Sequence, residues 1–339
     1  MGWGILSPFP LNILMKIFDG HSDILTDVTI KRMEGKKNIL KNYHIDRLKK
    51  GGVGASILVN WVDPPFDKNP MNRMIQVLGS TFEEIQDMAD CAAIAYNAED
   101  IEKIKENGKF AIILGFEGLS GLGKNVSFLN ALYFLGIRHS MLTWNEENEF
   151  ATGVLSPHED RGVTKLGVQA LKKMEQLKMI VDVSHANEKT FWDIYENTTR
   201  PFIASHSNCY AICPSNRNLK DDQIKAVAER GCVIGMNAWP DFISNDGNPT
   251  LEKFAYHVDH IADLVGIDHI SLGFDFCDFL GTDSTESFQQ GSLNATPGIE
   301  DASKISNFLK ILKKRGYTKE QIEKISYRNI MRVIREILG

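Results

Sequence analysis

The sequence has few cysteines and no long apolar run. Its 339 residues include five cysteines, an odd and scattered set, so a disulfide framework is not indicated and reduced thiols in a cytoplasm are expected. No run is long enough to cross a bilayer. Residues 1–16 lack the basic start, apolar centre and cleavage site of a signal peptide. We therefore expect a cytoplasmic protein with no membrane segment. The cysteines are Cys91, Cys209, Cys213, Cys232 and Cys277.

Clusters of one sign of charge are also missing. The 38 Lys and Arg residues are dispersed among 44 Asp and Glu residues, and the net charge is -6. This balance argues against nucleic acid and membrane surfaces as partners. No low-complexity or linker-like segment interrupts the chain, so residues 1–339 are predicted to form a single domain.

Eight apolar, strand-like runs alternate with amphipathic stretches. Several runs are apolar on both faces, which is typical of parallel strands covered by helices. The alternation predicts βα units and a parallel sheet. Eight units in this length favour a (β/α)8 TIM-type barrel with extra C-terminal helices, and a doubly wound open sheet is the alternative. The runs are Ile13–Phe18, Val53–Asn60, Phe110–Phe116, Arg138–Thr143, Met179–Val183, Pro201–Ala204, Cys232–Asn237 and His269–Phe274.

Helical periodicity fills most of the intervals between these runs. Glycines close several of the helical stretches, as C-cap residues do. A long loop, Gly281–Pro297, follows the eighth strand and is predicted to form an active-site flap. The predicted helices are Ile39–Lys50, Phe82–Tyr96, Asp100–Glu106, Val168–Leu177, Lys189–Glu196, Asp222–Arg230 and Leu251–Val265, with Ala302–Leu312 and Lys319–Leu338 in the tail.

The segment Asp19–Asp23 directly follows the first predicted strand. Residues two apart on a strand point to the same side, so His21 and Asp23 are expected to aim an imidazole and a carboxylate at one point. Such a pair at the C-terminal end of a barrel strand is typical of a metal site in hydrolases. The alternative is a turn histidine and a helix N-cap aspartate.

Other strand ends decide between these interpretations, because barrel chemistry sits at the C-terminal ends of strands. Glu117 ends the third strand, His185 and His206 follow the fifth and sixth, and Asp275 follows the eighth. Together with the first pair, these ligands are too many for one zinc ion, which takes about four. Two metals sharing a carboxylate would use them all.

The remaining histidines are not expected to take part. They lie at strand starts, in helices or before a helix end, and are predicted to be structural or solvated, except that the loop residue His158 is left open. They are His44, His139, His257, His260 and His269.

A phosphate-binding loop is nearly matched by Gly118–Asn125. Its last position is Asn125, which lacks the hydroxyl that holds magnesium. Nucleotide binding is therefore not expected.

Five short motifs, in order along nearly the whole chain, resemble those of the membrane (renal) dipeptidases, a zinc peptidase family of the amidohydrolase superfamily. The segment Ser215–Asn218, followed by Asp221 and Asp222, is similar to that family's substrate-binding loop. The motifs lie at residues 19–23, 116–118, 183–185, 205–207 and 272–276.

The resemblance implies a binuclear zinc site. His21 and Asp23 would bind the first metal, and His185 and His206 the second. Glu117 would bridge the two. Imidazole and carboxylate ligands also accept manganese, iron or cobalt.

The resemblance also implies roles in catalysis and substrate binding. Two metals would activate a shared water and polarise the scissile carbonyl. Asp275 matches an acidic residue near that water and could carry its proton to the leaving amine. Arg217 matches the arginine that holds the substrate carboxylate with a planar fork. The implied reaction is hydrolysis of dipeptides, L-Xaa-L/D-Xaa, through a metal-bridging hydroxide. A homodimer is the implied assembly.

The sequence departs from the family at two places. Trp144 follows the fourth strand where the family has a histidine that contacts the substrate, and an indole N–H can donate a hydrogen bond but cannot carry a proton. After the eighth strand, Cys277 is inserted beyond Asp275. Alternatively, Trp144 forms an aromatic wall of the pocket and has no catalytic role.

Two other functions are considered. One is a different binuclear-metal amidohydrolase reaction, that of a lactonase, phosphotriesterase or cyclic-amide hydrolase. Those relatives commonly bridge their metals with a modified lysine after the fourth strand, whereas the candidate bridge here is Glu117 after the third. The other is a metal-binding barrel without catalytic activity.

Overall fold

The structure is a computed structural model that describes residues 16–289 and 291–339. Eight parallel strands stand side by side in chain order and form a nearly closed barrel, which confirms the predicted (β/α)8 fold. The backbone N–H of Phe274 donates to the carboxylate of Asp19 over 2.9 Å and links the last strand to the first. The strands are β1 Ile17–Ser22, β2 Val53–Trp61, β4 Phe110–Glu117, β5 Ile137–Met141, β6 Ile180–Asp182, β7 Ile203–Ala204, β8 Val233–Met236 and β9 Ile270–Leu272.

The two longest strands show why the apolar runs were informative. Every residue of β2 and β4 is buried, because helices cover one face and the barrel interior the other. Gly115 in β4 is required by a close approach: a Cβ atom there would lie 2.4 Å from Nδ1 of His139. The strands thus leave no room to slip against each other at this point.

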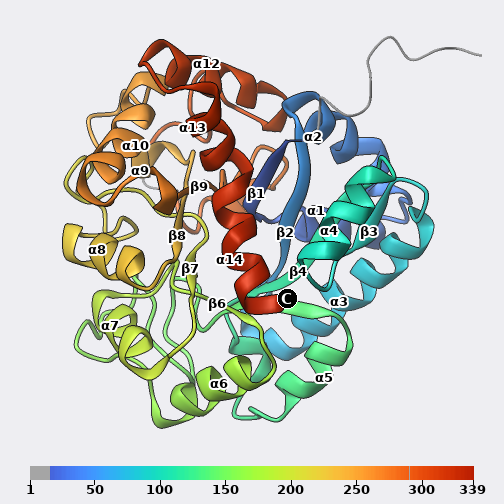
Figure 1. Cartoon of the computed structure of the whole chain (residues 1–339). Helices are drawn as coiled ribbons and strands as arrows, with labels where there is room; N and C mark the ends of the chain where they lie inside the picture. Colours follow the sequence, from blue (N-terminus) through green and yellow to red (C-terminus); the bar gives the residue numbers. More distant parts are fainter. Residues whose placement is uncertain (1–15, 290) are drawn as a thin grey trace, which may run out of the picture.

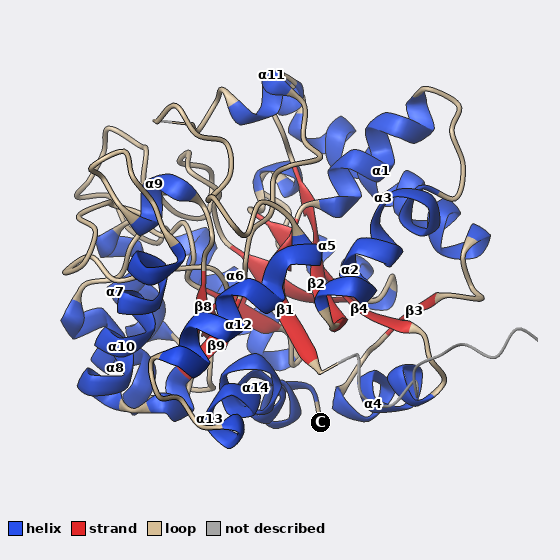
Figure 2. Ribbon diagram, turned by 90° about the horizontal axis from the view of Figure 1, so that it is seen from above, coloured by secondary structure: helices blue, strands red, loops and turns tan. Residues whose placement is uncertain are grey.

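Helices surround the barrel (Figures 1 and 2). Alpha-helix α14 crosses the end of the barrel where the strands begin, and its side chains Ile330, Met331 and Ile334 pack in one cluster with interior residues such as Ala55 and Ile113. The helices are α1 Ile24–Met33, α2 Ile45–Gly51, α3 Pro70–Asp87, α4 Ala98–Glu106, α5 Phe128–Phe134, α6 Lys165–Gln176, α7 Glu188–Asn197, α8 Asp221–Glu229, α9 Pro240–Ile243, α10 Leu251–Val265, α11 Thr282–Thr285, α12 Ile305–Lys314, α13 Lys319–Glu323 and α14 Asn329–Leu338.

The first strand is placed differently from the prediction. Part of the predicted run Ile13–Phe18 lies outside the described residues, and β1 continues to Ser22, so that His21 belongs to the strand itself. Gly20 permits this extension, since a Cβ there would lie only 2.9 Å from the carbonyl oxygens of Leu272 and Ser205.

The predicted helix Phe82–Tyr96 was wrong at both ends. Helix α3 begins at Pro70, where the Asn69 side chain accepts from the N–H of Asn72, and it ends at Asp87. A short strand, β3 Ala92–Ile94, follows and pairs with the start of β4. Helices α1 and α5 were not predicted, and the tail run Lys319–Leu338 is divided by a π-helical turn.

No helix among the described residues combines the length and apolarity that crossing a membrane requires.

Candidate metal centre

His21 lies fully buried at the end of β1, with carboxylates on three sides. Its Nε2 atom lies 3.4 Å from Asp23, 3.5 Å from Glu117 and 3.7 Å from Asp275. Neither ring nitrogen of His21 has a hydrogen-bond partner, nor has Oδ1 of Asp23. Asp23 occupies the N-cap position of α1, but its side chain makes no capping bond. The carboxylate is therefore turned toward the histidine rather than used by the helix.

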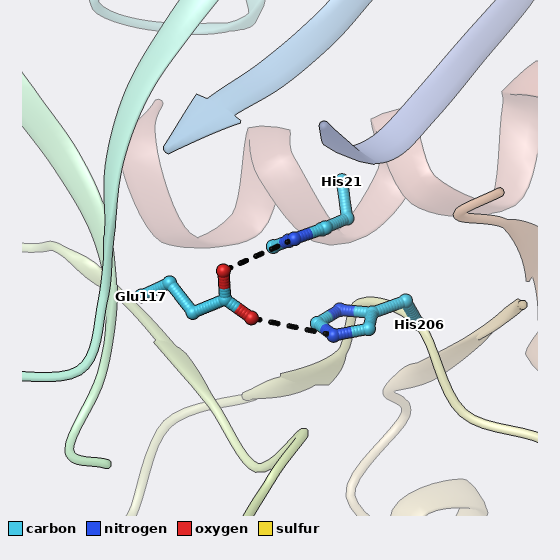
Figure 3. Close-up of side chains that lie close together, drawn as sticks. All are labelled: His21, Glu117 and His206. Carbon is cyan, nitrogen blue, oxygen red and sulfur yellow. Dashed lines mark ion pairs between the residues drawn. The ribbon is translucent and has the colours of Figure 1, made fainter. Parts of the chain in front are cut away.

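Glu117, the last residue of β4, stands between two groups of ligands. Its Oε2 faces His21, while its Oε1 lies 2.7 Å from Nε2 of His185 and 3.7 Å from Nε2 of His206. Figure 3 shows the Glu117 carboxylate with one oxygen toward His21 and the other toward His206. This is the geometry expected of a carboxylate shared between two cations.

The other two histidines are held so that their Nε2 atoms converge. Nδ1 of His185 lies 2.8 Å from Oδ1 of Asn145, which can only accept, so this nitrogen carries the proton. Nδ1 of His206 lies 2.7 Å from the Ser205 hydroxyl. The two Nε2 atoms are 2.9 Å apart. If the Ser205 hydroxyl accepts from Nδ1 of His206, both Nε2 lone pairs and the Glu117 oxygen face one another, an arrangement that a cation would stabilise.

Backbone hydrogen bonds place these two histidines. The Oδ1 atom of Asp182 accepts the N–H of Ser184 over 2.9 Å and that of Ser205 over 3.0 Å, which are the residues just before His185 and His206. Its Oδ2 atom accepts from His139 over 2.8 Å. One buried carboxylate thus fixes the ends of both β6 and β7.

Two site residues have left-handed backbones. The φ angles are 67° for His185 and 58° for Asp275. Such angles are costly for residues other than glycine and cluster at functional sites. The Oδ2 atom of Asp275 accepts from Asn237 over 3.0 Å, which leaves Oδ1 facing His21.

The charges at the site are strongly coupled. Burial raises the pKa of Glu117 well above its usual value, and the nearby Asp23 raises it further. Burial lowers the pKa of His21, but Glu117 and Asp23 outweigh it and the net shift is upward. The pKa values of His185 and His206 fall well below normal, chiefly through burial. Three carboxylates crowded around His21, beside the neutral imidazoles of His185 and His206, form a set of oxygen and nitrogen donors in which a divalent cation could take the place of the bound protons.

Arg217 forms the edge of the site. It is 7% exposed, one terminal nitrogen lies 3.1 Å from Nε2 of His185, and its Nε atom has no partner. Burial lowers its pKa to about 10, and the guanidinium remains charged at neutral pH. A buried cation with an unused N–H is a ready partner for an anionic group.

Trp144 lies in the wall of the cavity. Its ring is 5.1 Å from that of Trp61 and 6.2 Å from that of His185. Trp61 ends β2 beside Glu117 and was missed in the sequence, although it stands one residue beyond the predicted strand end, where functional residues were sought.

The segment 281–297, here called the strap, was predicted to be an active-site flap. The structure places it beside the candidate site, since its residue Phe288 lines the cavity together with Leu280, Trp61 and Trp144. Phe288 is the one aromatic residue of this segment, and that was the signal by which the sequence could have identified it.

The histidines predicted to lie outside the site do so. His44 pairs with Asp27 over 2.8 Å, and both ring nitrogens of His257 are bonded to backbone groups. His260 contacts Asp221 and His269 contacts a backbone carbonyl. The open case, His158, is bound to Glu147 at the surface.

All eight sequence-predicted site residues gather at the C-terminal ends of the strands. Two groups of three residues each bring their ligand atoms within 4.8 Å of one another. One group is His21, Glu117 and His206, and the other is His21, Asp23 and Asp275. Imidazole nitrogens and carboxylate oxygens are a donor set that zinc and other divalent metals accept. The residues therefore fit a metal group.

A (β/α)8 barrel with such ligands at its mouth defines the class of metal-dependent barrel hydrolases. The membrane dipeptidase family (peptidase family M19) matches residues 10–338. The chain belongs to this family and is a metallo-dipeptidase, as the sequence motifs predicted.

Individual relatives agree with this assignment. An uncharacterised dipeptidase of Schizosaccharomyces pombe is 30% identical over 94% of this chain and 79% of its own length. An uncharacterised protein in the pqqA 5′ region of Klebsiella pneumoniae is 31% identical over 79% of this chain and 97% of its own.

The solved structure of a metallopeptidase from Rhodobacter sphaeroides, liganded with a phosphinate mimic of the dipeptide L-Ala-D-Ala, superimposes with a TM-score of 0.82. It is 22% identical and covers 95% of this chain and 99% of its own. This likeness shows the shared fold.

Proposed function

We propose that this protein is a zinc-dependent dipeptidase that hydrolyses the peptide bond of L-Xaa-L/D-Xaa dipeptides with two metal ions. The proposal is carried by the convergence of unpaired His21 and Asp23 atoms with Glu117, His185 and His206 at one end of the barrel. His21 and Asp23 would hold the first ion, His185 and His206 the second, and Glu117 both. When bound, such ions lower the pKa of water and polarise a carbonyl.

The chain's own residues have distinct parts in this reaction. Arg217, through its unused N–H, would bind the carboxylate of the substrate's second residue and so limit the length of the peptide. Asp275 would accept a proton from the attacking water and donate it to the leaving amine. Burial raises the pKa of Asp275 above its usual value, and this direction of shift supports a role in proton transfer.

Trp144 is proposed to form a wall of the substrate cavity rather than to carry protons. Its ring contacts with Trp61 and His185 support this, and the indole has no proton to exchange at neutral pH. The residue would shape the site by its bulk.

A panel of L,L- and L,D-dipeptides tests the proposal. The protein is loaded with zinc and assayed with and without a chelator, and we expect hydrolysis that the chelator abolishes and zinc restores. Failure of the zinc-loaded protein to cleave any dipeptide would overturn the assignment of substrate. Repeating the loading with manganese, iron and cobalt identifies the preferred metal.

We further propose a cytoplasmic location and a homodimeric assembly. The five cysteines are all free, which supports a reducing compartment. Cell fractionation and light scattering test these two proposals separately.

A further inference from the structure

Two spaces of very different size meet at Arg217 and His185, which line both. One is a cavity of about 30 Å³ that the candidate ligands Asp23, Glu117 and His185 line on one side and aromatic rings line on the other. The other is a cleft of about 590 Å³ formed by the loops that follow β5, β6 and β7. A cavity of the smaller size holds roughly two water molecules. The two ends of any substrate that spans the site therefore meet very different restrictions.

Aromatic rings make the smaller cavity narrow. The ring of Phe288 lies 6.2 Å from that of Trp61, 6.3 Å from that of Trp144 and 5.0 Å from that of Trp239. Trp61 and Trp144 are 5.1 Å apart. Because each ring packs against its neighbours, one cannot turn away without disturbing the others. These residues are called the aromatic cluster.

Hydrogen bonds to the segment after β8 anchor the strap on the C-terminal side of Phe288. On the N-terminal side the strap directly follows a turn in which the N–H of Leu280 donates to the carbonyl of Cys277 over 3.0 Å. After Phe288, the N–H of Gly291 donates to Asp241 over 3.1 Å, and the Thr296 hydroxyl donates to the carbonyl of Ala238 over 2.6 Å. These bonds hold Phe288 over the cavity.

The position of Arg217 sets the direction of a bound dipeptide. If Arg217 binds the substrate carboxylate, the second residue lies next to the large cleft that Arg217 also lines. Its side chain branches from the same Cα as the carboxylate and faces that cleft. The first residue then extends across the barrel mouth. In a ring of eight strands β2 stands opposite β7, so the first residue approaches Trp61 and its aromatic neighbours.

We propose that the aromatic cluster restricts the first residue of the substrate to a small side chain, such as that of glycine or alanine, and that Phe288 is the specificity-determining residue. The side chain of the second residue is little restricted. This inference rests on the proposed function, because it assumes that the carboxylate of a dipeptide binds Arg217.

Two series of dipeptides test the inference. The first varies the first residue (Ala-Ala, Leu-Ala, Phe-Ala), the second varies the second residue (Ala-Ala, Ala-Leu, Ala-Phe), and kcat/KM is measured on zinc-loaded protein. We expect the wild type to favour Ala-Ala over Phe-Ala by about tenfold or more, a ratio within the reach of a hydrophobic pocket. The second series should vary much less.

Substitution of Phe288 provides the decisive comparison. Phe288→Ala should lower the ratio of kcat/KM for Ala-Ala to kcat/KM for Phe-Ala severalfold, and Phe288→Leu should lower this ratio less. Phe134→Ala, at a surface phenylalanine that is 87% exposed, is the matched control and should leave the ratio unchanged. Bound metal and Tm are measured for each variant, and Phe288→Leu decides the outcome if the alanine variant does not fold.

The outcomes separate this inference from the function on which it rests. Equal kcat/KM values of the wild type for Phe-Ala and Ala-Ala would overturn the inference alone. So would a Phe288 variant that keeps its metal content and the wild-type ratio of these two kcat/KM values. Absence of cleavage of every dipeptide would count against the proposed function itself.

Discussion

The two oxygens of the Glu117 carboxylate face different histidines across the barrel mouth, and this makes the side chain hard to replace. Oε2 faces His21 and Oε1 faces His185 and His206. An amide of the same shape offers one acceptor oxygen and one N–H₂ donor, so it can serve only one side of such a bridge.

Glu117→Gln should therefore bind fewer than two metal ions. We expect the zinc content after loading and dialysis to fall from two per chain to one or less, as measured by elemental analysis, with a corresponding loss of dipeptide cleavage. Glu149→Gln, at an exposed glutamate in the loop after β5, is the control and should retain two ions. A stoichiometry of two in Glu117→Gln would exclude the bridging role.

At the scale of elements, the ends of β6 and β7 depend on one side chain. β6 has three residues and β7 only two, so few ladder bonds hold them together. Asp182 joins their ends by accepting the N–H groups of Ser184 and Ser205, and His139 holds the carboxylate from below. Mutation of a residue that positions a metal ligand typically lowers the affinity for the metal by about 10- to 100-fold.

Asp182→Ala should weaken zinc binding by about tenfold or more, because His185 and His206 lose their fixed backbone positions. Titration with a competing chelator measures the dissociation constant. Asp27→Asn is a matched control, since Asp27 forms an equally short, buried bond with His44 away from the candidate ligands. If both variants lower Tm but leave zinc affinity equal to that of the wild type, Asp182 is merely structural.

At the scale of the whole molecule, α14 closes the end of the barrel remote from the candidate site. Ile330, Val333 and Ile334 of this helix are buried against the strand interiors. Helix α14 thus packs on strand residues from Phe18 in β1 to Val233 in β8, and we propose that residues 1–339 form a single domain.

Ile334→Ala should lower the free energy of unfolding by about 2–5 kcal/mol, the usual cost of truncating a fully buried isoleucine. Denaturant unfolding followed by near- and far-UV circular dichroism measures it, and the two signals should coincide in one transition. Glu336→Ala, on the exposed side of the same helix, should change little. Two separate transitions in the wild type would contradict the single domain.

Much of the fold could be predicted because buried parallel strands are apolar on both faces, as in Ala111–Leu114 of β4. The candidate ligands could be predicted because barrel chemistry has a fixed place, the strand ends. Pairings made only in three dimensions could not, and the bond between His139 and Asp182 is an example. The start of α3 was missed because its N-cap signal, Asn69 and Pro70, precedes the apolar stripe on which the prediction was based.

The short joint between β6 and β7 has a consequence for how the barrel withstands heat. Among the strands that pair, β6 and β7 share the shortest ladder, with Asp182 opposite Ile203 alone, and the candidate ligands His185 and His206 follow these two strands. An ion bound by both histidines would cross-link the segments that follow β6 and β7. Loss of the ion would then loosen the wall of the barrel itself, so that the chemistry and the durability of the molecule would fail together.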